Sequence, residues 1–328
     1  YLLFLIFITI ISYLLLFASH TYRPDAGLYH LPFIKILNEE KIIFGLTNLH
    51  FRYGHTSIIQ YLSAINLNLI TNTYGIVIPS ALIAVSVILN FLSKIKNQIK
   101  LKNYNFHFYY LFGVLIYIFF KMNRYSEYGN DAPAHFLTFY LFSEFIILNN
   151  KKVKIDQILN ICLLSLFIIL NKLTLLPILL IPISLIIKNI SFKFIKNFKI
   201  YFIFFFAVLW VIKNIFISGC LIYPLAFTCN EKLNWTDLEK IEKISIENEA
   251  FSKNWPNYDQ KNLLSQSDYI KNFIWFKTWT KKFVDEQKEK SFAYIIFLMI
   301  LYFIISFKTV KSDKFFEKNL IFLLLLIL

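Results

Sequence analysis

The chain has 328 residues, of which 57% are hydrophobic and 19% aromatic, and it carries a formal net charge of +14. This composition excludes a disordered or fibrous chain and is typical of a membrane protein with several spans. In a soluble protein, so large a positive charge would indicate nucleic-acid binding. Here the lysines fall mostly in short segments between apolar runs, so we attribute the charge to membrane topology and expect no nucleic-acid partner.

Apolar runs close to the roughly 20 residues that a helix needs to cross a bilayer predict about nine membrane spans. We place them at residues 1–17, 74–93, 106–120, 132–148, 155–170, 173–187, 200–218, 292–307 and 319–328. Because the first and last runs reach the ends of the sequence, we expect both to be truncated transmembrane helices. The predicted fold is an all-α polytopic membrane protein that forms a single transmembrane domain over residues 1–328.

The apolar stretch at residues 155–187 is predicted to fold as a hairpin of two helices. As one helix it would be roughly 50 Å long at 1.5 Å per residue, which is too long for one crossing. We place the turn at residues 171–174 and expect Pro177 and Pro182 to bend the second helix. A single long helix is the alternative.

Charge alternates between the loops. Lysines dominate the loops at residues 94–107, 151–156, 188–199 and 307–318, which the positive-inside rule places in the cytoplasm. The two large remaining regions, 18–73 and 219–290, then lie outside, where we expect them to cap a cavity. The predicted location is the bacterial inner (plasma) membrane, with the site facing the periplasm or exterior.

The outside region 219–290 holds four of the five tryptophans. Residues 236–249 predict a polar helix with Thr236 or Asp237 as its N-cap. Residues 265–285 predict one amphipathic helix. Tryptophan-rich helices beside a membrane tend to lie in its interface, and we expect these to do so.

Two of the three cysteines lie in this outside region. A disulfide between Cys220 and Cys229 is allowed there, but two cysteines do not make a framework, so the sequence leaves the bridge open. Cys162 lies in an apolar run, where we expect it to pack as a small hydrophobic residue.

The three arginines are the first candidates for binding a substrate. Arg23, Arg52 and Arg124 all fall in the first two outside loops, whereas lysine supplies the other basic side chains. A guanidinium can grip phosphate with two parallel hydrogen bonds, which lysine cannot do, so we predict that they bind a phosphate. A scatter of surface residues is the alternative. Lys172, at the hairpin turn, could also contact a phosphate or could extend to the interface.

Acidic residues and histidines accompany the arginines. Asp25 follows the first apolar run closely, and Asp131 precedes a helix with Pro133 in its first turn, where it could serve as an N-cap. Glu127, Asp131 and His135 could hold Mg²⁺ or Mn²⁺, although their spacing is not that of a tight metal motif.

Other polar residues complete the set of candidates. Tyr29, His30 and His55 in the first outside loop are candidates for substrate binding. Glu144 and Lys213 lie within apolar runs, where an ionisable group is a functional candidate by default. Both lie close enough to a helix end to reach polar surroundings instead.

Four motifs carry a resemblance to a known superfamily. They are R-P-D-A-G-L-Y-H-L at 23–31, G-L-T-N-L-H-F-R-Y-G-H-T-S at 45–57, N-D-A-P-A-H at 130–135, and S-G-C-L-I-Y-P-L-A-F-T-C at 218–229. With one acid after the first span and a second in the next outside loop, the chain resembles the GT-C superfamily of integral membrane glycosyltransferases. It is most similar to largely uncharacterised bacterial membrane proteins found with surface-polysaccharide genes.

This resemblance implies transfer of a sugar from a polyprenyl-phosphate-linked donor to a cell-surface glycan or lipid acceptor. Asp25 would act as base or metal ligand, and Asp131 would be the second-loop acid. Many members have an acidic pair where this chain has Asp25 alone, which leaves metal use open. An O-antigen-type polymerase or ligase is one alternative, and a lipid-linked oligosaccharide flippase or transporter is another.

Overall fold

The computed structural model describes residues 2–3, 6–7, 9–10, 14, 24–55, 57–125, 128–149, 153–189, 197–260 and 262–290, with the backbone alone at 122–125 and 286–290. Within these ranges the chain forms eleven α-helices and several short 3-10 or π turns, and no strand. The predicted all-α class is therefore confirmed.

The chain divides into two compact units. Unit 1 holds the described residues of Tyr1–Ile42 and Thr56–Trp210, and unit 2 holds those of Ile43–His55 and Val211–Val310. The first predicted outside region is therefore shared between the units, because its middle segment folds with residues far along the sequence. Whether the units make up one transmembrane domain stays a prediction.

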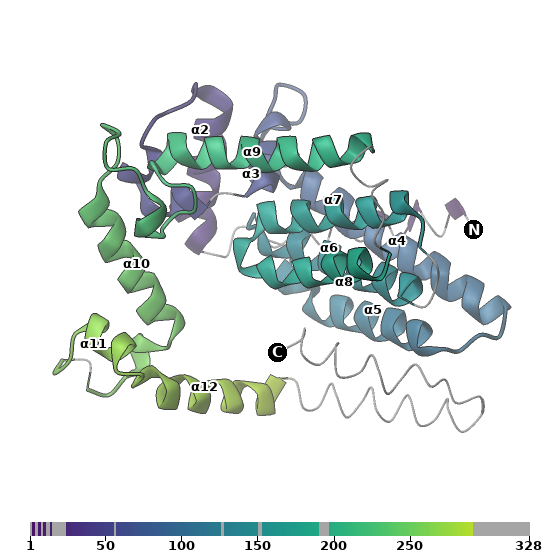
Figure 1. Ribbon diagram of the computed structural model, residues 1–328. Helices are drawn as coiled ribbons and strands as arrows, with labels where there is room; N and C mark the ends of the chain where they lie inside the picture. The colour runs from purple at the N-terminus through teal and green to yellow at the C-terminus, as the bar shows by residue number, and fades with distance from the viewer. Residues whose placement is uncertain are drawn as a thin grey trace. The chain divides into compact units, whose positions relative to one another are not determined.

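Unit 1 is built on a group of packed helices (Figure 1). They are α4 (Ile78–Lys100), α5 (Phe106–Tyr125), α6 (Asp131–Leu148), α7 (Ile155–Asn171) and α8 (Leu180–Lys188). One apolar cluster joins α4, α5 and α6 through the fully buried Phe91, Leu111 and Phe136. A second cluster joins α6 to α7 and α8 through Leu141, Ile158 and Ile181, among others.

Shorter elements precede α4 in unit 1. They are the π turn η2 (Ala26–His30), α2 (Leu31–Glu39), α3 (Ile58–Ile65) and the 3-10 turn η5 (Asn72–Val77). Ile34, Ala64 and Ile76 bury a small apolar cluster among these elements, and Tyr128 from the next predicted outside loop packs against it. The described residues of the first outside region that belong to unit 1 are thus mostly folded into short helical elements.

The predicted hairpin is confirmed. Helix α7 ends at Asn171, Lys172 is extended (φ −147°, ψ 102°), and the 3-10 turn η6 (Leu173–Leu179) with α8 returns along α7. Pro177 lies inside η6, and a proline lacks the N–H that a continuous helix would need. The alternative of one long helix is excluded.

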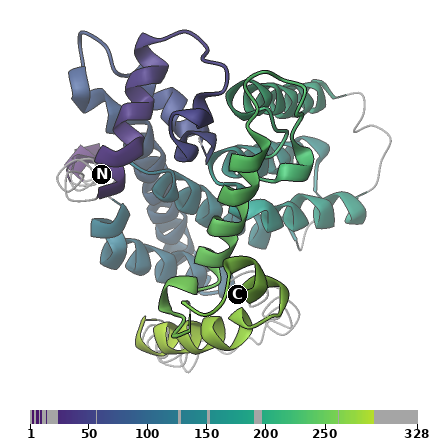
Figure 2. The same cartoon turned by 90° about the vertical axis from the view of Figure 1, so that its left-hand side faces the viewer.

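The long helix α9 (Phe198–Ser218) begins in unit 1, and its last part, from Val211 on, belongs to unit 2. A loop leads to α10 (Leu238–Ser252), and α11 (Gln266–Lys271) and α12 (Trp275–Lys290) lie at the far end of α10 (Figure 2). Of the two predicted N-cap residues, Thr236 and Asp237, the N-cap of α10 is Asp237. Its carboxylate accepts the Lys240 N–H at 3.0 Å.

The prediction of one amphipathic helix over residues 265–285 is wrong, because the chain breaks between α11 and α12 at Phe273, where φ is 56°. The Tyr269 hydroxyl donates to the Lys253 carbonyl oxygen at 2.8 Å, and the Lys253 ammonium lies 4.5 Å from the Trp275 ring centroid. On one straight helix Tyr269 and Trp275 would point about 120° apart, at 3.6 residues per turn. The break lets both contact Lys253.

By length and composition alone, two described helical stretches could cross a membrane, namely Asn72–Lys100 and Phe198–Ser218. A buried core helix of a soluble protein can pass the same test, so about nine spans are not confirmed. Shorter apolar helices lie at Phe106–Lys121, Ile155–Asn171 and Leu173–Lys188. The predicted spans 292–307 and 319–328, and most of 1–17, lie outside the described residues.

Candidate functional site

Asp25 lies at the start of η2 in unit 1 and is exposed. It occupies the N-cap position, but its side chain makes no cap hydrogen bond. Tyr29 follows on the same turn, half-buried, with its ring centroid 4.2 Å from that of His30. The carboxylate of Asp25 is thus accessible from solvent, as a base that acts on a substrate must be.

His30 is buried and held as one tautomer by Gln60. The Gln60 carbonyl oxygen accepts the Ser57 N–H at 3.2 Å, so the amide nitrogen is the group that lies 2.7 Å from His30 Nδ1. This nitrogen donates, so Nδ1 accepts and the ring proton lies on Nε2. His30 therefore fastens η2 to the start of α3.

Asp131 and Lys172 form an ion pair with 2.6 Å between Oδ1 and Nζ, and each side chain is little more than a quarter exposed. The pair joins the start of α6 to the hairpin turn after α7. Beside it, the Asn130 side chain donates to the Asn171 carbonyl oxygen at 2.8 Å, and Asn171 Oδ1 accepts the Ile59 N–H at 3.0 Å. Two predicted site residues are thus brought together next to the first turn of α3.

The bounds of α6 correct one predicted role of Asp131. The N-cap of α6 is Asn130, and Asp131 is the first helical residue, so Asp131 is not the cap. The Lys172 ammonium is already engaged by a carboxylate, and its charge opposes a divalent cation at Asp131. His135 lies one turn further along α6 and is half-buried.

Part of the predicted site cannot be placed. In the described part of the chain, no three His, Cys, Asp or Glu side chains form a group that could hold a metal ion. Arg23 and Glu127 lie outside the described residues, and so does the side chain of Arg124.

Unit 2 brings two of the sequence motifs together. The segment Ile43–His55 contains the 3-10 turns η3 (Leu46–Asn48) and η4 (Phe51–His55). The Gly45 N–H donates to the Phe216 carbonyl oxygen at 2.9 Å. Gly45 has a φ of 67°, and a Cβ there would lie 2.7 Å from the Cβ of Trp235, so glycine is required. Residues 45–55 of this motif are thereby fixed against the end of α9 and the loop that follows it.

Tyr223 is the centre of this contact. Its ring packs on the backbone at Gly54, where a Cβ would lie 2.3 Å from a ring carbon, and it meets His55 edge-on with 5.5 Å between ring centroids. Its hydroxyl is buried and has no hydrogen-bond partner among the described residues. Burial raises the pKa of Tyr223, so the hydroxyl remains a donor. A buried donor left unpaired costs about 1–3 kcal/mol, so an acceptor such as water or a ligand oxygen is expected.

Basic side chains gather around His55, whose ring packs on that of Tyr223. His55 is exposed as a residue, but part of its ring is buried. This burial is the main reason that its pKa lies below the ordinary value of 6.5, and the positive charges of Arg52 and Lys213 lower it further. Arg52 is exposed, and Lys213 lies on α9, roughly 7.5 Å along the helix axis before Ser218. We call Arg52, His55, Lys213 and Tyr223 the basic cluster. It combines an arginine, a lysine and a buried phenol donor, residue types that suit an anion such as phosphate.

Sequence reasoning singled out Arg52, His55 and Lys213 but missed Tyr223 and the contact between the motifs. The glycines could have indicated this contact. The chain has only seven, and three of them, Gly45, Gly54 and Gly219, lie in these two motifs. Cys220 and Cys229 are joined by a disulfide, which closes the loop that carries Tyr223.

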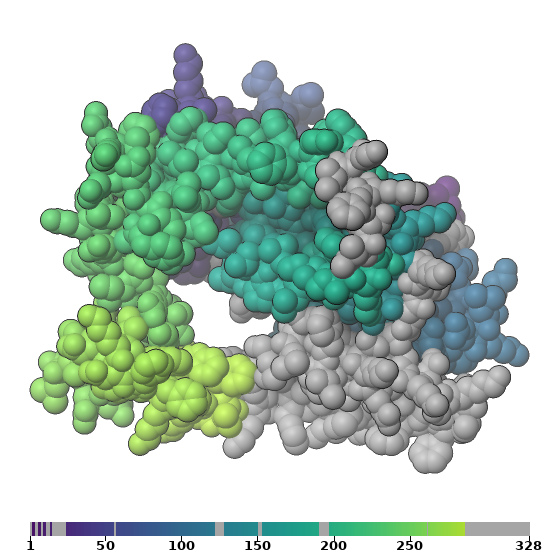
Figure 3. All heavy atoms as spheres, in the orientation of Figure 1, coloured from purple at the N-terminus to yellow at the C-terminus, as the bar shows by residue number. Residues whose placement is uncertain are grey.

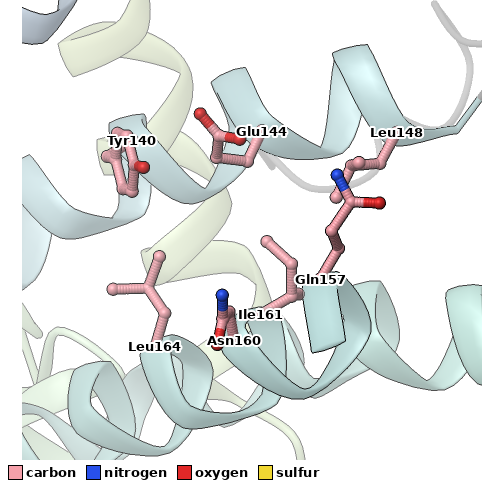
Figure 4. Close-up of a pocket in the computed structure, with 7 residues that line it drawn as sticks. All are labelled: Tyr140, Glu144, Leu148, Gln157, Asn160, Ile161 and Leu164. Atoms are coloured by element: carbon pink, nitrogen blue, oxygen red, sulfur yellow. The ribbon is translucent and has the colours of Figure 1, made fainter. Parts of the chain in front are cut away.

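A cavity of about 320 Å³ lies elsewhere, between α6 and α7 of unit 1 (Figure 4). Its lining contains none of the residues predicted for the site. Glu144, a candidate for function from its place in an apolar run, lines this cavity and is ion-paired with Lys94 of α4. The pair satisfies both charges and links α4 to α6, so Glu144 has a structural role. The cavity residues are Tyr140, Glu144, Leu148, Gln157, Asn160, Ile161 and Leu164.

Comparison with known proteins identifies a family. No similar protein was found among curated proteins or among solved structures. One family model, described as a domain of unknown function (DUF8201), matches residues 1–328. Because this match covers the whole sequence, the chain belongs to the DUF8201 family.

Proposed function

We propose that the protein is an integral membrane glycosyltransferase of the GT-C type, which moves a sugar from a polyprenyl-phosphate-linked donor to a cell-surface glycan or lipid acceptor. The observation that carries this proposal is the basic cluster, in which His55 lies within electrostatic reach of Arg52 and Lys213 and packs edge-on against Tyr223, whose hydroxyl is buried. The cluster lies at the end of an apolar helix that is long enough to cross a membrane. A lipid-linked phosphate has its charge at that level, directly above hydrocarbon.

The surface of α9 supports the membrane part of the proposal. Only 11% of its most apolar window is buried, against 61% for the stretch Asn72–Lys100. Phe204 and Phe205 are among its exposed aromatic residues, and the helix lies uncovered in the space-filling view (Figure 3). So continuous an apolar surface is unfavourable in water and favourable against lipid. The proposal places about nine spans in a bacterial inner membrane, with the basic cluster on the outer side.

In the proposed reaction, a hydroxyl of the acceptor attacks the anomeric carbon of the donor sugar. The bond from that carbon to the phosphate oxygen breaks, and the bonding electrons leave with the phosphate. The Arg52 guanidinium and the Tyr223 hydroxyl stabilise this developing negative charge. Asp25 keeps the role that the resemblance implies, as the base that takes the acceptor's proton.

The phosphate-binding step can be tested with a short-chain polyprenyl phosphate and the full chain in lipid nanodiscs. Arg52→Gln removes a charge-assisted hydrogen bond worth about 1.5–3 kcal/mol, so affinity should fall about 10- to 100-fold. Lys232→Gln is the matched control, because Lys232 is an exposed cation of the same unit outside the cluster. Equal affinities for Arg52→Gln and Lys232→Gln would remove the basis of the proposal.

The same cluster also fits an O-antigen-type polymerase or ligase. Its members include an arginine and a histidine, the residue types expected to dominate such a site. In that reaction Asp25 would be dispensable, whereas the glycosyltransferase of the GT-C type needs it. Substitution of Asp25 therefore separates the two.

A further inference from the structure

The loop that the Cys220–Cys229 disulfide closes, here called the disulfide loop, has two unlike sides. Tyr223 faces inward, is 5% exposed, and packs with Cys220, Ile241 and Ile244. The other large apolar side chains face outward. They are Leu221, Ile222, Leu225 and Phe227, of which Phe227 is 87% exposed.

These outward side chains stand on a well-fixed loop. The Leu221 N–H donates to the Thr228 carbonyl oxygen at 3.1 Å, and the Thr228 N–H donates to the Leu225 carbonyl oxygen at 2.9 Å. The Thr228 hydroxyl accepts the Ile222 N–H and donates to the Leu225 carbonyl oxygen. Much of the polar backbone is thus satisfied within the loop, as a segment that enters an apolar phase requires.

The loop continues the apolar surface of α9. It follows directly on the end of that helix at Ser218, and Leu209 and Ile212 are exposed before that end. No charged residue lies between Lys213 and Glu231. Exposed apolar side chains on an uncharged loop beside a candidate span match the hydrocarbon edge of a membrane.

We infer that the disulfide loop inserts Leu221, Ile222, Leu225 and Phe227 into the hydrocarbon of the outer membrane leaflet. This inference rests on the proposed function and deepens it. With its outer side in hydrocarbon and Tyr223 on its inner side, the loop holds the basic cluster at the level of lipid phosphates. The site then takes a phosphate carried by a membrane lipid, and not one carried by a soluble nucleotide sugar.

Photo-crosslinking tests the insertion directly. Benzoylphenylalanine replaces Phe227 in the full chain, which is placed in vesicles that contain a phospholipid with an alkyne on its acyl chain. Phe205 on α9 is the positive control, and Phe251, an exposed phenylalanine on α10, is the matched negative control. We expect lipid adducts at 227 to equal those at 205 and to exceed those at 251 several-fold. Any of three results would overturn the inference. They are lipid adducts at 205 but not at 227, equal adducts at 251 and 227, and capture of a second copy of the chain at 227.

A second measurement distinguishes a phosphate carried by a membrane lipid from a free phosphate in solution. Phe227→Asp opposes insertion but leaves the basic cluster unchanged. Retention of a polyprenyl phosphate from vesicles should fall several-fold, whereas binding of inorganic phosphate by the detergent-solubilised variant should not change. Equal retention by wild type and variant would contradict the inference. Neither assay contains a sugar donor, so lipid adducts at 227 in a protein without transfer activity would refute the proposed function and not the loop.

Discussion

The ring of Tyr223 meets the ring of His55 edge-on, with 5.5 Å between their centroids, and this contact joins two motifs that are far apart in the sequence. His55 ends the segment Ile43–His55, and Tyr223 lies in the disulfide loop. The hydroxyl of Tyr223 is buried without a partner among the described residues, and His55 lies within electrostatic reach of Arg52 and Lys213. The cluster therefore has a donor in place for an anion that it would hold.

Tyr223→Phe should separate binding from stability. The substitution removes a buried, unpaired hydroxyl, so thermal stability without ligand should stay equal or rise by up to about 1–3 kcal/mol. The stabilisation that a polyprenyl phosphate gives to the wild type should shrink, because the variant lacks one donor. Thermal unfolding with and without the lipid measures both effects. A variant that loses stability and keeps the full ligand-induced shift would show that the hydroxyl has only a structural role.

Gly54→Ala should destabilise unit 2. Its Cβ would lie 2.3 Å from the Tyr223 ring, and overpacking of this kind typically costs about 1–3 kcal/mol. Gly27→Ala is the matched control, because nothing lies within 4 Å of a Cβ at that position. Unfolding of the two variants, followed side by side, checks this. Equal stability would mean that the segment Ile43–His55 does not pack on Tyr223.

Asp131→Asn should destabilise unit 1 by about 1–3 kcal/mol, because it leaves the largely buried ammonium of Lys172 without its partner charge. The double variant Asp131→Asn/Lys172→Met should recover much of the loss. Asp156→Asn breaks an exposed pair with Lys199 and should have no measurable effect. If Asp131→Asn unfolds like Asp156→Asn, the ion pair does not stabilise the fold.

The free energy of unfolding should decrease as the pH is lowered below 6.5, because of His55. The folded pKa of His55 lies below 6.5, so as the pH falls the unfolded chain takes up its proton first. Stability from this residue is therefore full above pH 6.5, declines as the pH falls below it, and levels off below the folded pKa. Denaturation between pH 8 and pH 4 should show a smaller decline for His55→Gln than for the wild type. Identical pH profiles would show that His55 is not held neutral by its neighbours.

Local features of the sequence predicted the hairpin of unit 1 and the start of α10 in unit 2. The length of the apolar run relative to a bilayer and the cytoplasmic placement of the loop at residues 188–199 predicted the break near Asn171. The N-cap preference of threonine and aspartate gave Thr236 and Asp237 as the two candidates for the start of α10. Non-local contacts left no comparable pattern. The backbone hydrogen bond from Gly45 to Phe216 joins two segments with no shared sequence pattern, and the pairing of Asp131 with Lys172 depends on how α6 and α7 pack. The break at Phe273 likewise follows from a tertiary contact, that of Lys253 with Tyr269 and Trp275.

Sugar transfer by the full chain tests the central claim most directly. Membranes that contain wild type, Asp25→Asn, Arg52→Gln or the control Asp156→Asn are supplied with a panel of polyprenyl-phosphate-linked hexoses, and release of polyprenyl phosphate is measured. A general base contributes about 10²–10⁴-fold, so Asp25→Asn should lose activity in that range and Arg52→Gln should also be impaired. Asp156→Asn should match the wild type. Full activity in Asp25→Asn with loss in Arg52→Gln would favour the polymerase or ligase, and full activity in both variants would contradict the account.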